Sequence, residues 1–519
     1  MTSLLVPFRH LVVIHYHLRP GGVRRVMEKS LPLLLAAGCS EHATVTFAFG
    51  GTGVAEWEEE LRQSLAPHQV RFLRVPAFGY FSESRLPPAR RREKIRQALA
   101  DLVPAHETKE TLIWTHNMAL GRNLILADEI VRWVGARGLA LISQHHDFWF
   151  ENRWGRWKEM RQSGYRTLAD VARVTFGGSG AMVFINRADQ QLWKRHLPQR
   201  TVWVPNAVSP PAPPTQRRLR TVKGQLAKFL GDDGPLWVVP TRFLRRKNLA
   251  EAVLLTRWLR PEAWLLTTAG ISSAGEQSYA RGLSAAARRG GWRVRFGILS
   301  GSGGGLATID EMIAAAEVIL LTSVQEGFGL PILEAAAAGK PLVARKLPRL
   351  QQDFCAMGID FPQGYDEVSV PRALFNWPKE QARQRQLWRN AKAALPTPLR
   401  GMMGAPLEEG PTVPFSRLTL DAQLEILALP IEESWAACRD LNPYLVTWRS
   451  LAAKGQFEVA PWPTEKNSLL ASKVMIGHWR RAVLQSRRRA ADPKVVADLQ
   501  NKLINRSLNG KLQFPVLME

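Results

Sequence analysis

Two carboxylates with seven residues between them, Glu326 and Glu334, flank a glycine-containing turn in the segment SVQEGFGLPILEAAAAGKP (323–341). The segment follows a β-like apolar run, and Pro331 suits the first turn of a helix. The amides of residues 328–330 would then point out of a helix N-terminus, where anions bind. This pattern predicts a phosphate-binding turn with a hydroxyl-binding carboxylate on each side. The alternative is an ordinary strand–loop–helix connection with surface acids.

A cluster of cations occurs in a second segment, TRFLRRKNLAEAV (241–253), which also follows a β-like run. Arginine can hold a phosphate through two parallel hydrogen bonds, and lysine acts as a compact positive charge. Two such cations would offset the charge on a leaving phosphate group. The segment offers four cations, Arg242, Arg245, Arg246 and Lys247, and by itself it does not decide between them. The alternative is a basic loop that is exposed to solvent.

The first part of the chain contributes a glycine pair and several histidines. Gly21 and Gly22 follow the apolar run LVVIH (11–15), as in a strand–glycine–helix connection. Their amides would approach a ligand closely, although turn glycines with a purely structural role are equally compatible with the pattern. Two adjacent histidines, His145 and His146, follow a later apolar run.

The elements that would position these residues are short apolar runs alternating with helical stretches. In the first part of the chain, strands are predicted over 11–15, 43–49, 111–116, 139–144 and 181–185. Helices are clearest over 23–37 and 89–102, and Pro32 predicts a kink or two shorter helices in the first of these. Such alternation predicts a parallel sheet with helices on both faces.

The proline-rich segment SPPAPPT (209–215) is a stiff, extended linker that separates two such domains. Beyond it, strands are predicted over 235–240, 263–270, 292–298, 317–323 and 340–345. We therefore predict an α/β protein with one doubly wound domain over 1–208 and another over 216–395. Residues 396–519 form a loop and helical extension, with helices over 418–429 and 473–489. Two doubly wound domains facing a cleft would bring the carboxyl ends of both sheets to one ligand site.

The two-carboxylate segment is similar to the E-x(7)-E signature of retaining glycosyltransferases with the GT-B fold, and over residues 10–395 the chain resembles glycosyltransferase family 4. The resemblance implies that Glu326 holds the donor sugar, while Arg242 and Lys247 stabilise the leaving nucleoside diphosphate. It also places a histidine near the reacting carbon. His146 is our choice, and His145 is the alternative. The donor-binding residues implied in this way are Gly21, Gly22, Phe328, Gly329, Leu330 and Glu334, the last of them on the ribose.

Other parts of the chain fit the resemblance without a fixed role. His116, Asn117 and Asn206 lie in segments similar to family patches, and His15 and His17 would line the acceptor side. In many GT-B folds a terminal helix crosses back to the first domain. The helix over 418–429 is our candidate for that crossing.

The implied reaction is transfer of a sugar from a nucleotide-sugar to an acceptor, with retention at the anomeric carbon. The leaving phosphate itself would help to deprotonate the acceptor, and no metal or other cofactor is expected. The sequence does not identify the acceptor, which is a glycan, a lipid or a small molecule. Two alternatives stay open. One is a nucleotide-sugar epimerase, and the other is a non-catalytic anion- or membrane-binding module on a GT-B shell.

The composition adds a strong positive charge. The 519 residues carry 70 Lys and Arg against 45 Asp and Glu, a formal net charge of +25, which predicts an anionic partner. The basic stretches 89–96 and 478–489 fit solvated helix faces or contacts with anionic lipid headgroups. Nucleic acid is disfavoured, because no nucleic-acid-binding motif accompanies the charge.

The three cysteines are far apart and lack disulfide or zinc spacing, and no apolar run has the length of a membrane span. These features predict a cytoplasmic protein. In the lipid-binding reading, it would lie peripherally at the inner face of the membrane.

Overall fold

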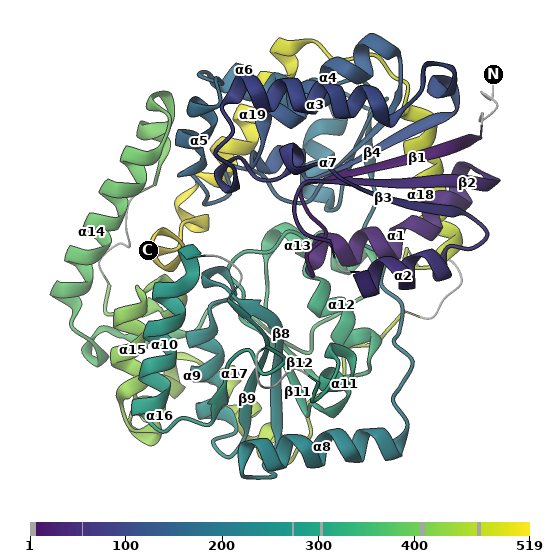
Figure 1. Cartoon of the computed structure of the whole chain (residues 1–519). Coiled ribbons are helices and arrows are strands. Elements are labelled where there is room, and N and C mark those ends of the chain that lie inside the picture. Colours follow the sequence, from purple (N-terminus) through teal and green to yellow (C-terminus); the bar gives the residue numbers. More distant parts are fainter. Residues whose placement is uncertain (1–6, 54, 272–273, 301–304, 405–409, 464–468) are drawn as a thin grey trace. The chain divides into compact units, whose positions relative to one another are not determined.

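The computed structural model describes residues 7–53, 55–271, 274–300, 305–404, 410–463 and 469–519 (Figure 1). They form two compact units. Unit 1 comprises Met1–Ala207, Ala393–Met403 and Glu465–Asn509, and unit 2 comprises Val208–Lys392, Gly404–Thr464 and Gly510–Glu519. Each unit is built on a parallel sheet with helices around it, which confirms the predicted α/β class with two doubly wound sheets.

The sheet of unit 1 has the order β3-β2-β1-β4-β5-β6-β7, and its neighbouring strands are parallel. Its strands are β1 (Phe8–His15), β2 (Cys39–Phe49), β3 (Gln69–Arg74), β4 (Thr111–His116), β5 (Ala140–His145), β6 (Ala181–Phe184) and β7 (Thr201–Trp203). The five predicted strands are all present. The two unpredicted ones, β3 and β7, are the edge strands. One is largely exposed and the other has three residues, so neither shows a long apolar run.

Helices pack on this sheet and against one another. They are α1 (Gly22–Gly38), α2 (Ala55–Ser64), α3 (Pro88–Leu102), α4 (Leu124–Arg137), α5 (Arg156–Gln162), α6 (Leu168–Phe176), α7 (Arg187–Lys194), α18 (Ser472–Gln485) and α19 (Pro493–Ser507). The prediction of two shorter helices around Pro32 is wrong, because α1 is one helix that contains this proline. Its apolar face, which includes Met27, Leu31 and Leu34, is buried, and this packing offsets the proline's cost of about 3 kcal/mol.

Part of the C-terminal segment completes the core of unit 1. Helix α18 packs on α1, and its Met475, Trp479 and Ala482 belong to the same apolar cluster as β1 and β4. The expectation that the helix over 418–429 returns to the first domain is wrong. That helix, α15 (Leu420–Ala428), belongs to unit 2, where it packs on α9 and α10.

The sheet of unit 2 has the order β10-β9-β8-β11-β12-β13, again with parallel neighbours. Its strands are β8 (Leu236–Phe243), β9 (Trp264–Ile271), β10 (Val294–Arg295), β11 (Val318–Leu321), β12 (Leu342–Arg345) and β13 (Gln363–Tyr365). A separate antiparallel pair is formed by β14 (Ser369–Pro371) and β15 (Thr412–Pro414). Each of the five predicted strands overlaps one of these, and β13 was not predicted.

The linker residues 209–215 have no regular secondary structure and lead into α8. The helices of unit 2 are α8 (Gln216–Leu230), α9 (Leu249–Leu259), α10 (Gln277–Arg289), α11 (Ile309–Ala315), α12 (Leu330–Ala337), α13 (Pro348–Ala356), α14 (Trp377–Ala394), α15, α16 (Ile431–Cys438), α17 (Pro443–Ala453) and α20 (Pro515–Met518). Helices α15, α16 and α17 pack on α9, so this part of the C-terminal extension covers one face of the unit 2 sheet.

Candidate functional site

The two loops that carry the predicted charges start at the same edge of the unit 2 sheet, because β8 and β11 are neighbouring parallel strands. After β8 the chain forms a short 3-10 helix, η5 (Arg245–Lys247), and after β11 it forms the loop 322–329. The Thr322 hydroxyl donates hydrogen bonds to the carbonyls of Lys247 and Asn248, over 2.9 and 3.1 Å. This buried threonine therefore ties the cationic loop to the loop of the glutamate.

The carboxylate of Glu326 is the centre of a buried ionic cluster. It accepts hydrogen bonds from Lys247 Nζ, from Arg246 Nη1 over 2.9 Å and from Ser323 Oγ over 2.6 Å. Only 6% of Lys247 and 7% of Glu326 are exposed, so the charges interact with little screening. Burial by itself raises the pKa of Glu326, but the charges of Lys247 and Arg246 outweigh it and lower the pKa. The carboxylate is thus ionised at neutral pH.

The turn after this carboxylate leads into α12 through a left-handed glycine. Gly329 has φ 80°, and a Cβ there would lie 3.2 Å from both Ile332 Cδ1 and Phe354 Cζ. Pro331 lies in the first turn, and no side chain among the described residues caps the helix. The predicted amides at residues 328–330 are therefore available to an anion.

The remaining predicted residues of unit 2 also lie at this edge. Arg242 is near the end of β8. The pKa of Lys247 is lowered chiefly by burial, and the positive charges of Arg246 and, to a smaller extent, Arg242 lower it further. Glu334 is half-buried on α12, one turn beyond Leu330. Sequence reasoning left Arg246 unassigned and missed Ser323. The only sequence features that could have pointed to them are the position of Arg246 beside Lys247 and that of Ser323 three residues before Glu326.

Unit 1 has a histidine group at the corresponding edge of its own sheet. His15 ends β1, His116 ends β4 and His146 follows β5, and these three strands are neighbours. His15 Nδ1 lies 3.2 Å from the carbonyl oxygen of His116, and His116 Nδ1 lies 3.2 Å from His146 Nε2. Burial lowers the pKa of each imidazole, that of His146 to about 4. The group is therefore uncharged at neutral pH.

The structure separates the two adjacent histidine candidates. His145, the last residue of β5, lies among the rings of Phe148, Phe176 and Phe184, with centroid separations of 6.1, 5.1 and 5.2 Å. Neither of its ring nitrogens has a hydrogen-bond partner among the described residues. Hence His146, and not His145, joins the histidine group.

The buried His145 predicts an acid-sensitive stability. Burial lowers the pKa of this imidazole from 6.5 to about 3. Between these two pH values, the imidazole is protonated in the unfolded chain but neutral in the folded chain. Stability is lost as the pH falls from 6.5 toward 3, by about 2 kcal/mol between pH 7 and 5. His145→Phe, which matches the surrounding rings, should remove this part of the loss. Chemical denaturation of both proteins at pH 7 and 5 measures it.

His106→Gln is the matched control, because the side chain of His106 is 81% exposed and its loss should leave the pH dependence unchanged. An equal loss of stability in wild type and His145→Phe between pH 7 and 5 would contradict the assignment.

The glycine pair of unit 1 lies at the start of α1, which is also without a side-chain cap among the described residues. A Cβ at Gly22 would meet nothing within 4 Å, so packing does not require a glycine there. The contact of Gly21 and Gly22 with a donor stays a prediction.

Several arginines of the basic stretches bind inside unit 1. Arg91 is buried and donates to the carbonyls of Gly79 and Phe81, and Arg487 donates to those of Lys109 and Gly138. These guanidiniums form hydrogen bonds with backbone carbonyls inside unit 1. They therefore do not form a single exposed charged face. Among the described residues, no helix has the length and apolarity to cross a bilayer.

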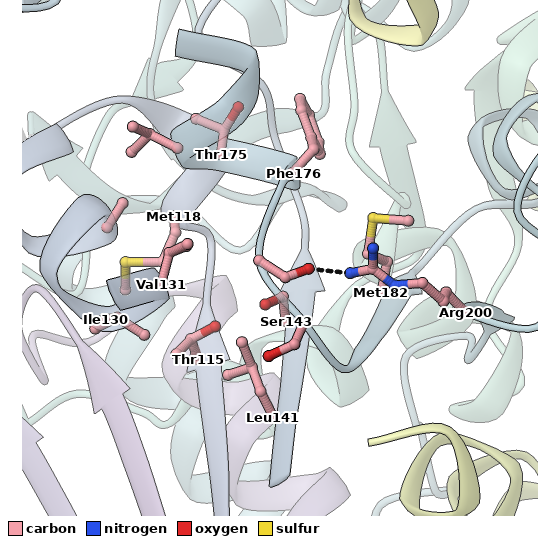
Figure 2. Close-up of a pocket in the computed structure, with 14 residues that line it drawn as sticks. Thr115, Met118, Ile130, Val131, Leu141, Ser143, Thr175, Phe176, Met182 and Arg200 are labelled. Carbon is pink, nitrogen blue, oxygen red and sulfur yellow. Dashed lines mark hydrogen bonds between the residues drawn. The ribbon is translucent and has the colours of Figure 1, made fainter. Parts of the chain in front are cut away.

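A small cavity of unit 1 is lined by residues other than the predicted site residues (Figure 2). Thr115, Ser143 and Arg200 are among the residues that line it, together with apolar side chains from α4 and α6. Arg200 is held by the carbonyls of Gly178 and Gly180. None of the predicted site residues lines this cavity. Across the described part of the chain, no group of three or more His, Cys, Asp or Glu side chains is placed to hold a metal ion.

The comparison with known proteins finds a match to a family model within unit 2. Residues 227–359 match the family model described as glycosyl transferases group 1. Mannosylglucosyl-3-phosphoglycerate synthase of Petrotoga mobilis is 23% identical over 359 residues, which cover 66% of this chain and 66% of that protein, just under two thirds of its length.

Two solved structures are similar in backbone. HepE of Anabaena, determined with UDP-glucose, has 14% identity and a TM-score of 0.47, and the match covers 86% of this chain and 98% of that one. A glycosyltransferase of Rickettsia africae has 12% identity and a TM-score of 0.46, with coverage of 97% and 99%.

The family match contains both Lys247 and Glu326, and each unit has a doubly wound parallel sheet. The chain therefore has two doubly wound α/β units, and the second of them contains the stretch that is similar to the glycosyl transferases group 1.

Proposed function

We propose that this enzyme transfers a sugar from a nucleotide-sugar donor to an acceptor, with retention of configuration at the anomeric carbon. The observation that carries the proposal is the buried cluster of Lys247, Arg246 and Glu326 beside the uncapped N-terminus of α12. This arrangement offers positive charge and free amides to a diphosphate, and an ionised carboxylate to sugar hydroxyls.

The roles divide between the two sides of the turn. Arg242 and Lys247 would stabilise the negative charge that develops on the leaving diphosphate, since their low-dielectric surroundings strengthen the attraction. Glu326 would hold the hydroxyls of the sugar, with the amides of Phe328, Gly329 and Leu330 beside it. Glu334, one helical turn further on, would accept hydrogen bonds from the ribose.

Unit 1 would supply the remaining groups. His146 is proposed to contact the donor sugar as a neutral imidazole, in agreement with its lowered pKa of about 4. Gly21 and Gly22 would let the backbone approach the donor. The leaving phosphate would take the acceptor's proton, so no protein nucleophile is required. We propose that neither a metal nor another cofactor takes part, which requires activity to survive EDTA.

The nearest alternative is a nucleotide-sugar epimerase on the same fold. It would convert the free nucleotide-sugar into an isomer without any acceptor, and analysis of the products distinguishes the two reactions. A non-catalytic module on a GT-B shell would bind neither donor nor diphosphate.

The test is a thermal-shift screen of the full chain against UDP, GDP, ADP and their common sugar conjugates. A ligand at 100 times its dissociation constant should stabilise the protein by about 2.7 kcal/mol. Glu334→Ala should lose this effect, whereas Glu433→Ala, which removes an exposed carboxylate of unit 2, should keep it. No stabilisation of wild type by any nucleotide would contradict the proposal.

The location of the enzyme is a separate part of the proposal. We propose that it acts in the cytoplasm, and peripheral contact with an anionic membrane stays a prediction. Co-sedimentation with phosphatidylglycerol vesicles, and its absence with phosphatidylcholine vesicles, would support that contact.

A further inference from the structure

Two arginines of unit 1, Arg122 and Arg156, are not used by the proposed reaction. Arg122 lies on a loop that follows β4, and Arg156 is the first residue of α5, which follows β5. Arg156 is 9% exposed, and its Nη1 donates to the carbonyl of Leu120 over 2.6 Å. Arg122 lies over the ring of Tyr80, with its Cζ 4.7 Å from the centroid. No carboxylate among the described residues forms an ion pair with either arginine.

The loops that carry these groups are fixed to one another. Asn123 Nδ2 donates to the carbonyls of Ala77 and Gly79, over 2.9 and 2.8 Å, and the amide of Phe81 donates to the carbonyl of Arg122 over 2.7 Å. The Tyr80 side chain is therefore held against Arg122. Such bonds preorganise the positively charged loop before any ligand arrives.

The Tyr80 hydroxyl is a neutral group near Arg122. The Tyr80 hydroxyl lies 2.9 Å from His17 Nε2, and its ring is 5.4 Å from that of Tyr16. The Nε of Arg122 is buried without a hydrogen-bond partner among the described residues. A ligand that supplied acceptor atoms here would satisfy a donor that the protein leaves unpaired.

The nearby acids only partly offset the positive charge of the cluster, and Asp147 opposes the lowering of the Arg156 pKa. Asp147 and Glu151 pair with Arg153, over 3.3 and 3.7 Å, and Glu83 pairs with Arg19 over 2.9 Å. Burial, followed by the charges of Arg153 and Arg122, lowers the pKa of Arg156 well below its ordinary value. Two guanidiniums close together in a poorly solvated place repel each other, and a bound anion would relieve that repulsion.

We propose that Arg122, Arg156 and the Tyr80 hydroxyl bind an oxyanion, a phosphate monoester or a carboxylate, that is carried by the sugar acceptor. Guanidiniums grip such groups through parallel hydrogen bonds, and a tyrosine hydroxyl adds a third donor. The oxyanion site follows from unit 1 alone. Its assignment to the acceptor rests on the proposed function, in which the donor's diphosphate is bound by unit 2.

Inorganic phosphate is the probe, followed by thermal shift of the full chain at constant ionic strength set with sodium chloride. Because phosphate would also bind near Lys247, the titrations are made in Lys247→Met protein. Arg122→Gln in that background should raise the half-saturating phosphate concentration at least about tenfold, as expected for loss of a charge-assisted pair of bonds. Arg90→Gln, which removes an exposed arginine of unit 1, should change it less than about twofold.

Tyr80→Phe provides a second variant that keeps the ring beneath Arg122. It should weaken phosphate binding by about threefold to tenfold, the value of one hydrogen bond. Unchanged phosphate binding in both Arg122→Gln and Tyr80→Phe, with normal melting in the absence of phosphate, would overturn the oxyanion site.

The class of acceptor is tested with glucose 6-phosphate, glucuronate and glucose, each added to the donor found in the nucleotide screen. Stabilisation and product formation with the phosphate ester alone identify phosphate, and with glucuronate alone identify a carboxylate. Equal effects of glucose, insensitive to Arg122→Gln, overturn the acceptor assignment. Thermal stabilisation by the nucleotide should be unchanged in Arg122→Gln. If the wild-type protein shows no such stabilisation, the proposed donor site fails, and the oxyanion site is still tested by the phosphate titration.

Discussion

Lys247→Met is expected to lower the rate of nucleoside diphosphate release from the donor by about 10²–10³-fold, as for loss of one preorganised charge at a developing negative group. The result rests on the proposed function and has a definite physical cause. Lys247 is 6% exposed, so its ammonium acts on the leaving diphosphate with little screening by water. The measurement is the initial rate of diphosphate release with the donor identified by the nucleotide screen.

Loss of Lys247 also changes Glu326, which keeps its bonds from Arg246 and Ser323 but loses one of two cations. Nucleotide stabilisation should fall together with the rate, because the ammonium is used in both the bound state and the reaction. A variant that melts normally but keeps the wild-type rate would exclude Lys247 from the site.

Arg245→Met is the matched control from the same short helix. Its guanidinium points elsewhere and donates to the carbonyl of Gly275 and to Ser278 Oγ, the latter over 2.8 Å. Both variants remove one cation from η5 and keep an unbranched side chain of similar length. The rate should therefore fall by less than about threefold in Arg245→Met, a change typical of a charge outside the reacting centre.

The segments of the candidate site were predictable because each is local in sequence. Glu326, Gly329 and Glu334 lie within one strand–loop–helix connection, whose glycine and proline positions have direct conformational meaning. The pairing of Lys247 with Glu326 was not predictable in the same way. It depends on β8 and β11 being neighbours, a property of sheet order that no periodicity within either segment contains.

Adjacent residues at the end of a strand illustrate a second limit. His145 and His146 are the same residue type at the end of an apolar run, so the sequence does not distinguish them. Successive side chains along an extended chain point to opposite faces of the sheet. One therefore lies among Phe176 and Phe184, and the other meets His116. The choice requires knowing which face each side chain occupies.

The C-terminal extension shows the same limit at the level of helices. The spacing of Met475, Trp479 and Ala482 predicts an apolar helical face, yet any uncovered face could accept it. Only the structure shows that this face completes the core beside α1, while α15 packs on α9. Local pattern thus predicted these elements, whereas their partners required the tertiary fold.

Glu251→Leu is expected to destabilise unit 2 by about 3 kcal/mol, because the buried Arg345 loses one of its two carboxylate partners and keeps only Glu367. The fully buried carboxylate, in the first turn of α9, accepts two hydrogen bonds from Arg345 Nη2, over 2.5 and 2.6 Å, and a third from the Tyr365 hydroxyl. Burial raises the pKa of Glu251, and the charge of Arg345 opposes this shift. Hydrogen exchange in β12 and chemical denaturation measure the loss.

Arg345→Met should cost a similar amount, and the double variant should recover more than half of the summed loss, because it removes both charges. Arg383→Met, which breaks a partly exposed pair with Asp421 at 2.8 Å, should cost less than about 1 kcal/mol. Independent, additive losses in the double variant would show that Glu251 and Arg345 do not act as a pair.

The same carboxylate links stability to the proposed donor site. Asn248 Nδ2 donates to Glu251 over 3.0 Å, and the Asn248 carbonyl accepts from Thr322, which also holds the carbonyl of Lys247. Asn248 has φ 47°, a left-handed conformation that its side-chain bond helps to hold. The double variant should therefore regain stability without regaining full nucleotide binding, because the pair is replaced while the anchor of the η5 loop is not. Equal recovery of both properties would show that the loop is positioned without Glu251.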